Sequence, residues 1–385
     1  MSGQTTIHGE CDARFARLRE VFQKSFDEDR ETGASVAVVL DGRPVVDLWG
    51  GHADAARSRA WERDTIVNLY STTKGMTALC AHLLADRGLL DLDAPVARCW
   101  PEFAQAGKHE IPVRQLLCHQ AGLPGLRRKV EVEDLYAWER MTGWLAAEEP
   151  WWKPGSLHGY HALTFGWLAG EVVRRIAGTS LGTFFRDAIA RPLGLDLHIG
   201  LGAEHDARVA ELIRIPLAAQ RASPLFASLA SQDSLAAKVF SNPTIHPKQT
   251  RTRAWRAAEI PAANGHGNAR SIARLYGALA RGGELDGVRV IREAALAEAA
   301  REHAAGPDAV LAFPMHWGGG FIVNGARVIY GPNARSFGHS GYGGSFGFAD
   351  PDARLGMGYA MNRMGNAVAG DLRTLDLIRA VYASL

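Results

Sequence analysis

Ser71 and Lys74 are spaced so that one side chain could activate the other. They open a stretch, ending near Gly88, in which apolar residues recur at helical spacing: Met76, Leu79, Cys80, Leu83 and Leu84. On such a helix, side chains three residues apart share a face. Burial lowers the pKa of a lysine, and a neutral amine can take a proton from a serine hydroxyl. The spacing therefore predicts a nucleophilic serine with a lysine as its base.

The same pair has a plainer interpretation, in which Ser71 is a helix N-cap and Lys74 lies in solvent one turn further on. Short motifs also match by chance. Against this, only Cys80 and His82 are ionisable between Lys74 and Asp86, which indicates a helix buried nearly all round. Partners elsewhere in the chain must decide between the two interpretations.

One such partner is Tyr160, which follows the turn-rich segment that begins at Pro154 and precedes a helical pattern. A loop of this kind can hold a phenol rigidly. Beside a lysine, we expect the pKa of this phenol to be lowered, so that it shuttles a proton between Ser71 and the leaving group. The alternative is a buried tyrosine that donates to a backbone carbonyl.

A second partner is the glycine-rich run at 338–344, at a strand near the C-terminus. Glycines in a strand allow a substrate to approach the backbone closely. The same run would also suit a bulged edge strand.

The elements around these residues are predicted from periodicity and turn signals. A hairpin is expected around Asp41-Gly42, between strands at 34–40 and 44–49. Helices are expected at 12–29, 113–119, 132–147, 164–177, 270–280 and 367–385, and strands at 316–324, 326–330, 336–339, 345–350 and 355–362. The consecutive C-terminal strands favour an antiparallel sheet.

The predicted fold class is α/β (α+β), an antiparallel sheet flanked by helices with an inserted helical subdomain. Residues 1–90 and 265–385 would form the sheet domain, and residues 91–264 a mainly helical subdomain. Within it, the segment from about 201 to 261 has weak periodicity and is expected to be a variable, lid-like part.

Composition excludes several classes of protein. The 385 residues are 47% hydrophobic and 22% charged, which is ordinary for a globular protein. The net charge of +2 comes from 43 basic and 41 acidic residues spread along the chain, which gives no reason to expect nucleic acid as a partner. No stretch has the pattern of a secretory signal or a membrane span, so we expect a cytoplasmic protein without a membrane partner.

Cysteine and histidine usage fits this expectation. The four cysteines, Cys11, Cys80, Cys99 and Cys118, are expected to be reduced thiols rather than a disulfide framework. No His, Asp or Glu set has the spacing of a metal site, and His266, between glycines, favours loop structure over metal ligation. We therefore expect neither a metal nor another cofactor.

Five segments together resemble a known family. They are Ser71-Thr72-Thr73-Lys74, the run 91–96, the run 116–124, Pro154-Gly155 leading to Tyr160, and His339-Ser340-Gly341. In order and spacing they resemble the serine β-lactamase and penicillin-binding-protein superfamily, most of all its class C-like esterase branch, the family VIII carboxylesterases. The resemblance covers nearly the whole chain.

The resemblance implies roles for single residues. Ser71 is similar to the acylated nucleophile, Lys74 to its base partner, and Tyr160 to the tyrosine that opens the family's Tyr-x-Asn element. The segment His339-Ser340-Gly341 is similar to the family's Lys-Thr-Gly strand. It implies an oxyanion hole formed by the backbone N–H groups of Ser71 and Tyr342. Whether lysine or tyrosine takes the first proton stays open for the family.

Departures from the family pattern bear on the substrate. His339 replaces the lysine of Lys-Thr-Gly, and Ala162 replaces the asparagine of Tyr-x-Asn. Those two groups would help to hold the carboxylate and amide of a β-lactam or a peptide C-terminus, and losing such contacts costs about 1.5–3 kcal/mol. The expected substrate contacts are therefore His339, Ser340 and Gly341, with Trp152 either lining an acyl pocket or packing in the core.

Together these features predict a serine hydrolase that cleaves short-chain carboxylic esters through an acyl-enzyme on Ser71. Its partner would be a small-molecule ester. A β-lactamase, a D-amino-acid peptidase and an acyltransferase would use the same site residues. A non-catalytic binding protein on the same fold is the alternative of a different class.

Overall fold

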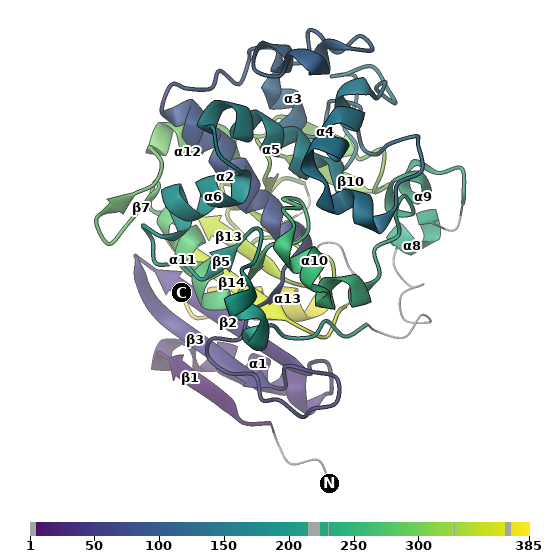
Figure 1. The fold of residues 1–385 in the computed structure, drawn as a ribbon. Coiled ribbons are helices and arrows are strands. Elements are labelled where there is room, and N and C mark those ends of the chain that lie inside the picture. The colour runs from purple at the N-terminus through teal and green to yellow at the C-terminus, as the bar shows by residue number, and fades with distance from the viewer. Residues whose placement is uncertain (1–4, 215–223, 230, 327, 366–370) are drawn as a thin grey trace.

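The protein is built on an antiparallel sheet to which both ends of the chain contribute. The structure is a computed structural model that describes residues 5–214, 224–229, 231–326, 328–365 and 371–385. Within these ranges the main sheet has nine strands in the order β1-β3-β2-β14-β13-β12-β11-β10-β9 (Figure 1). They are β1 Ile7–Cys11, β2 Gly33–Leu40, β3 Arg43–Gly51, β9 Ala304–Pro307, β10 Pro314–Trp317, β11 Ile322–Val323, β12 Phe337–Ser340, β13 Phe346–Asp350 and β14 Leu355–Met361.

Strand β2 joins the two chain ends and is buried on both faces. It pairs with β3 through a turn at Asp41 and Gly42, whose φ values of 51° and 82° are those of a two-residue hairpin turn. On its other side it pairs with β14, Val36 opposite Tyr359. Because both faces are covered, its sequence is a continuous apolar run rather than an alternating one.

Helices cover the two faces of the sheet. Helices α1 (Ala16–Asp27) and α13 (Leu372–Tyr382) share a buried cluster with Val36 and Val38 of β2. Helix α11 (Ala269–Ala280) packs on the other face, where Ala37 and Val39 meet Ala269 and Ala273. The alternation of β2 side chains thus places a helical layer on each side.

The chain between the site helix and the second half of the sheet is mainly helical, and Figure 1 shows it above the sheet. The site helix is α2 (Thr73–Asp86), and α12 (Glu293–Ala300) follows later in the chain. The intervening helices are α3 Val113–Leu117, α4 Trp138–Ala147, α5 Thr164–Ala177, α6 Leu181–Phe185, α8 Pro224–Leu229, α9 Leu235–Phe240 and α10 Arg253–Ala257. Short 3₁₀ helices lie at Ala13–Phe15, Tyr70–Thr72, Val96–Arg98, Pro101–Ala104, Val132–Tyr136, Ala203–Arg208 and Pro247–Arg251, and a π-helical segment at Arg186–Ala190. The predicted fold class is confirmed.

Several short strands were not predicted, and one predicted strand is wrong. Strands β4 (Val67–Asn68), β6 (His266–Gly267) and β5 (Leu197–His198) form a second sheet, so His266 lies in a strand rather than a loop. A hairpin of β7 (Glu284–Leu285) and β8 (Val288–Arg289) and the edge strand β1 were also missed. Two-residue strands carry too few side chains for a periodic signal.

The strand predicted at 326–330 is wrong for residues 326 and 328–330, which form no strand, and residue 327 lies outside the described residues. Asn324 Oδ1 accepts from the N–H groups of Ile329 and Tyr330 at 3.1 and 3.0 Å, so these donors do not enter the sheet. The expected strand at 316–324 is interrupted by three glycines and becomes β10 and β11. Residues 366–370 of the expected C-terminal helix, and residues 215–223 and 230 of the lid-like segment, lie outside the described residues.

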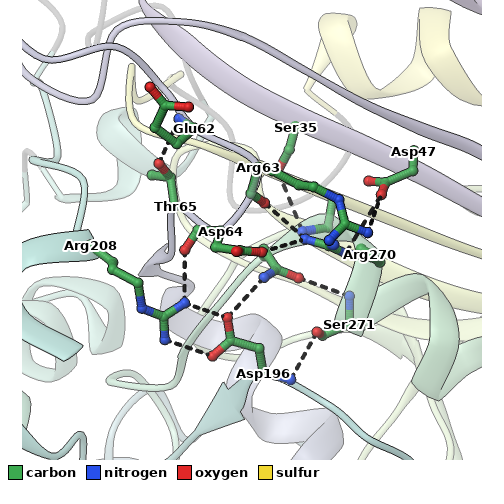
Figure 2. A network of polar contacts seen from close by, with 12 residues as sticks. Ser35, Asp47, Glu62, Arg63, Asp64, Thr65, Asp196, Arg208, Arg270 and Ser271 are labelled. Carbon is green, nitrogen blue, oxygen red and sulfur yellow. Dashed lines mark hydrogen bonds and ion pairs between the residues drawn. The ribbon is translucent and has the colours of Figure 1, made fainter. Parts of the chain in front are cut away.

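A polar network ties the helical region to the sheet, as Figure 2 shows. We call it the α11 network; it consists of Asp47, Arg63, Asp64, Asp196, Arg208 and Arg270. Arg208 pairs with Asp196 at 2.7 Å, and Ser271 of α11 accepts from the N–H of Asp196. Arg270 lies between Asp47 and Asp64, at 3.6 and 3.2 Å.

Among the described residues, no helix is long and apolar enough to cross a membrane.

Candidate active site

Ser71 lies in the single helical turn that leads into α2, and its side chain is nearly buried. The residue before it, Tyr70, has φ of 44°, in the left-handed region that bulky residues rarely adopt. Two contacts hold this conformation: Thr73 Oγ1 donates to the Tyr70 carbonyl at 2.5 Å, and the Leu69 N–H donates to the carbonyl of Gly265, just before β6, at 2.8 Å. Backbone strain of this kind is a feature of functional sites.

Lys74 is fully buried one turn further along α2. Its Nζ lies 3.2 Å from Ser71 Oγ, 2.7 Å from the Ala162 carbonyl and 3.0 Å from the Ala262 carbonyl. Burial lowers the pKa of Lys74 well below its usual value, which favours the neutral amine. A neutral amine has two N–H groups, which the two carbonyls accept, and one lone pair. The lone pair is then directed at the Ser71 hydroxyl.

Tyr160 completes the group from the loop before α5. Its Oη donates to Ser71 Oγ at 2.7 Å, and Lys74 Nζ lies 4.7 Å from the centre of its ring. The expectation of a lowered phenol pKa is wrong, because burial raises the pKa of Tyr160 and a neutral amine supplies no charge to oppose it. The phenol is therefore a proton donor at neutral pH.

The glycine-rich run after β12 lies against the start of α2. A Cβ atom on Gly341 would sit 2.2 Å from the Leu69 carbonyl, so only glycine fits there. Ser345 Oγ donates to the same carbonyl at 2.8 Å and lies 3.0 Å from Thr72 Oγ1. Within the described ranges, neither the N–H of Ser71 nor that of Tyr342 takes part in a backbone hydrogen bond. Both are left available as donors, as an oxyanion hole requires.

A cavity of about 210 Å³ opens beside Ser71. Its walls are mostly apolar, with the exposed Arg214 as a charged lining residue. Part of the wall comes from the segment predicted to be lid-like: Leu229, Val239, Phe240, Pro243 and Ile245. No periodic pattern marks these residues in the sequence, because they lie in short helices and turns.

The expected substrate contacts do not all reach this cavity. His339 is 1% exposed, burial lowers its pKa to about 3, and it lines a separate small void instead. Ser340 is also buried, with its hydroxyl 2.9 Å from that of Tyr330. Trp152 packs edge-on against His161, with ring centres 6.0 Å apart, so core packing is its role. Gly341 lies against the Leu69 carbonyl and does not line the cavity either, whereas Tyr342, expected in the oxyanion hole, does line it.

Three residues that the sequence analysis did not single out lie around Tyr160: His119, Trp317 and Asp308. His119 packs against the phenol, with ring centres 5.1 Å apart, and its Nδ1 accepts from the His161 N–H. Trp317 stacks on the same ring, and Asp308 accepts from the Tyr160 N–H at 2.9 Å. No local pattern connects Asp308 with a residue 148 positions away.

In the part of the chain that the structure describes, no cluster of three His, Cys, Asp or Glu side chains could hold a metal ion.

Comparisons with known proteins identify the family of this chain. The family model described as Beta-lactamase matches residues 18–380. The chain is 39% identical to the esterase/beta-lactamase LipL of Mycobacterium tuberculosis (strain ATCC 25618 / H37Rv), over 93% of this chain and 83% of that protein.

Solved structures match over almost the whole chain. A crystal structure of a family VIII carboxylesterase is 48% identical, with a TM-score of 0.92 over 99% of this chain and all of that one. A penicillin-binding protein homolog from Caulobacter crescentus is 44% identical, with a TM-score of 0.90 over 99% and 100% of the two chains. The order of strands, the buried serine and lysine and the family match point the same way: the chain belongs to the beta-lactamase family and is a serine hydrolase of its carboxylesterase branch.

Proposed function

We propose that the protein hydrolyses short-chain carboxylic esters through an acyl-enzyme on Ser71. The observation that carries this proposal is the position of Ser71 Oγ, 3.2 Å from Lys74 Nζ and 2.7 Å from Tyr160 Oη, at the edge of an apolar cavity of about 210 Å³. A cavity of this size suits a small acyl group.

Acylation begins with proton transfer from the Ser71 hydroxyl to the neutral amine of Lys74. Oγ attacks the ester carbonyl carbon, and the negative charge on the carbonyl oxygen is stabilised by the N–H groups of Ser71 and Tyr342. When the C–O bond to the alcohol breaks, the alcohol oxygen takes a proton from the Lys74 and Tyr160 pair. Because Tyr160 enters the reaction protonated, it is the donor to the leaving group, and the Lys74 ammonium restores its proton.

Deacylation repeats these steps with water in place of the alcohol. The neutral amine of Lys74 takes a proton from water, and the oxygen attacks the acyl carbon. Ser71 Oγ leaves and is protonated by the same pair, which returns the enzyme to its starting state. If another alcohol enters instead of water, the same cycle transfers the acyl group.

The choice of ester over β-lactam or peptide rests on β12. His339 is buried and neutral, so this strand presents no cation to a substrate carboxylate at the position where the family has lysine. Ala162 offers no amide donor, and its carbonyl is occupied by Lys74. The names of the similar proteins, a carboxylesterase and an esterase/beta-lactamase, support ester cleavage.

The test compares hydrolysis of p-nitrophenyl acetate and butyrate with hydrolysis of a chromogenic cephalosporin. We expect the esters to be cleaved far faster, and faster cephalosporin hydrolysis would reverse the assignment. A fluorophosphonate probe should label the wild type and not Ser71→Ala. A wild type that stays unlabelled and inactive would favour the non-catalytic binding protein.

Tyr160→Phe tests the assignment of the proton donor. We expect kcat for an ester with a poor leaving group to fall by roughly 10²-fold or more, and to fall less for a p-nitrophenyl ester, whose leaving group needs no proton. Tyr382→Phe, in α13, is the matched control and should keep wild-type kcat. An equal loss for both esters would contradict the role of Tyr160 as the donor.

A further inference from the structure

Asp308 lies in the turn between β9 and β10 and is 1% exposed. Its Oδ1 accepts from the N–H groups of Tyr160, Val310 and Leu311, each at 2.9 Å. Two of these bonds stabilise its own turn. The third reaches the backbone of the residue whose phenol contacts Ser71.

The second oxygen of Asp308 acts on the ring of Tyr160 through Trp317. Oδ2 accepts from the indole Nε1–H of Trp317 at 3.2 Å. The indole stacks on the Tyr160 ring, with ring centres 5.6 Å apart and planes 5° from parallel. One carboxyl group therefore holds both the backbone of Tyr160 and the aromatic surface on which its ring rests.

The two loops also meet beside Tyr160. The Ala309 N–H donates to the His158 carbonyl at 3.0 Å, and His158 Nε2 lies 3.2 Å from the Gly306 carbonyl. The segment 158–162 has no strand or helix of its own to fix its position. Its place relative to α2 therefore depends on contacts with other segments: Lys74 and His119 hold its residues 159–162, and the turn between β9 and β10 holds His158 and Tyr160.

We propose that Asp308 and Trp317 are positioning residues that hold the Tyr160 hydroxyl against Ser71. This proposal rests on the proposed role of Tyr160 in ester cleavage. Asp308 touches no substrate and transfers no proton. Its effect is on geometry, because Tyr160 transfers a proton along one hydrogen bond and kcat falls when its hydroxyl is displaced. A shift of about 1 Å can lower the rate on the order of 10²-fold.

Asp308→Asn tests the proposal by changing one atom. The amide keeps one oxygen for the three backbone N–H groups and places an NH₂ group opposite the indole N–H, where two donors cannot bond. We expect kcat to fall by about 10- to 100-fold while KM stays within about twofold. Trp317→Phe keeps a ring on Tyr160 without the donor, so its kcat should fall only about threefold or less.

The double variant separates positioning from general stabilisation. In Asp308→Asn with Trp317→Phe the two donors no longer oppose each other, so we expect kcat to recover to the level of Trp317→Phe alone. Trp317→Leu, which leaves Asp308 in place and removes the stacked ring, should lose kcat to the same extent as Asp308→Asn. It remains a test even if Asp308→Asn does not fold.

Asp350→Asn is the matched control. Asp350 is also fully buried at the end of a strand and accepts from Asn333 and from two backbone N–H groups. We expect both variants, Asp350→Asn and Asp308→Asn, to have a lower Tm than the wild type. We expect kcat to be unchanged in Asp350→Asn. Equal kcat losses for the two variants, an unchanged kcat in Asp308→Asn or Trp317→Leu, or no recovery in the double variant would overturn the proposal. A Tyr160→Phe with the expected loss of kcat alongside such a result leaves the proposed function intact, whereas a Tyr160→Phe with wild-type kcat for both esters contradicts the role of Tyr160 as the proton donor, on which this proposal rests.

Discussion

Two polar clusters in this molecule differ in whether their ionisable groups have partners of opposite charge. At the active site, Ser71, Lys74 and Tyr160 are buried, and no carboxylate pairs with Lys74 among the described residues. In the α11 network, carboxylates alternate with guanidinium groups, and the members are partly exposed (Figure 2). Neutralising partners stabilise the second cluster, and their absence makes the first reactive.

The pKa values of the two clusters show the same contrast. Burial lowers the pKa of Lys74, and no opposite charge restores it. Burial also acts on Asp196, whose pKa it raises, but hydrogen bonds from His198 and Arg208 outweigh burial, so the pKa of Asp196 lies below its usual value. Whether a partly or fully buried group keeps its charge is thus decided by its partners rather than by burial alone.

The largest expected effect is that of Ser71→Ala. Removing the nucleophile should lower kcat on the order of 10⁴-fold or more while the unfolding midpoint stays near that of the wild type. Ser35→Ala, in β2 beside the α11 network, is the matched control, because Ser35 only accepts a long hydrogen bond from Ala269. Ester hydrolysis by the two variants, followed at equal protein concentration, measures the contrast. Undiminished cleavage by Ser71→Ala would remove the distinction between the clusters.

Lys74→Met should lower kcat by roughly 10²- to 10⁴-fold, because it removes the base and keeps a side chain of similar volume. Lys238→Met, at an exposed position of α9, is the control and should keep its rate. Steady-state kinetics with p-nitrophenyl butyrate provides the comparison. A fully active Lys74→Met would mean that the amine is only a structural group.

The pH dependence of the wild type should report the neutral amine. Since the reaction needs Lys74 unprotonated, kcat/KM should fall as pH falls through its lowered pKa. The unfolded chain binds this proton up to pH of about 10.4, so the free energy of unfolding should rise with pH between the lowered pKa and that value. Chemical denaturation over this range should show the rise in the wild type and a flatter curve in Lys74→Met. Equal slopes would show that Lys74 is charged in the folded protein.

Asp196→Asn should have the opposite profile, with lower stability and unchanged catalysis. It removes the charge that Arg208 pairs with, which should lower the free energy of unfolding by about 1–2 kcal/mol. Because the folded pKa of Asp196 is lowered, its contribution is fully present above the unfolded pKa of about 3.9 and is lost gradually as pH falls from that value through the folded pKa. Urea unfolding at pH 7 and pH 3 should show a smaller difference from wild type at the lower pH. A change in kcat beyond twofold would couple the two clusters.

Arg63→Ala should have the smallest effect. Its guanidinium lies 3.8 Å from Asp47 and is largely exposed, so we expect less than about 0.5 kcal/mol. The same urea titrations, run at low and at high salt, measure this small difference. A larger loss would show that the α11 network acts as a unit rather than as separate pairs.

How far the sequence predicts this molecule depends on the range of the interaction. Helix α5 has the predicted bounds, because its apolar period and the left-handed Gly178 at its end are local signals. The Ser71 and Lys74 pair was found for the same reason. The direction of the Tyr160 pKa depends on what surrounds it in space, and the burial of His339 is likewise a property of packing. Asp308 reaches Tyr160 from a distant segment, and no local pattern marks such a contact.

The amine of Lys74 bonds to two main-chain oxygens from different parts of the chain, Ala162 in the loop before α5 and Ala262 in the turn before β6. It thereby links the site helix α2 to two segments of the helical region. A hinge motion that separated these parts would leave the amine without acceptors in an apolar interior. We therefore expect substrate to enter the cavity without a motion that separates these two segments from α2.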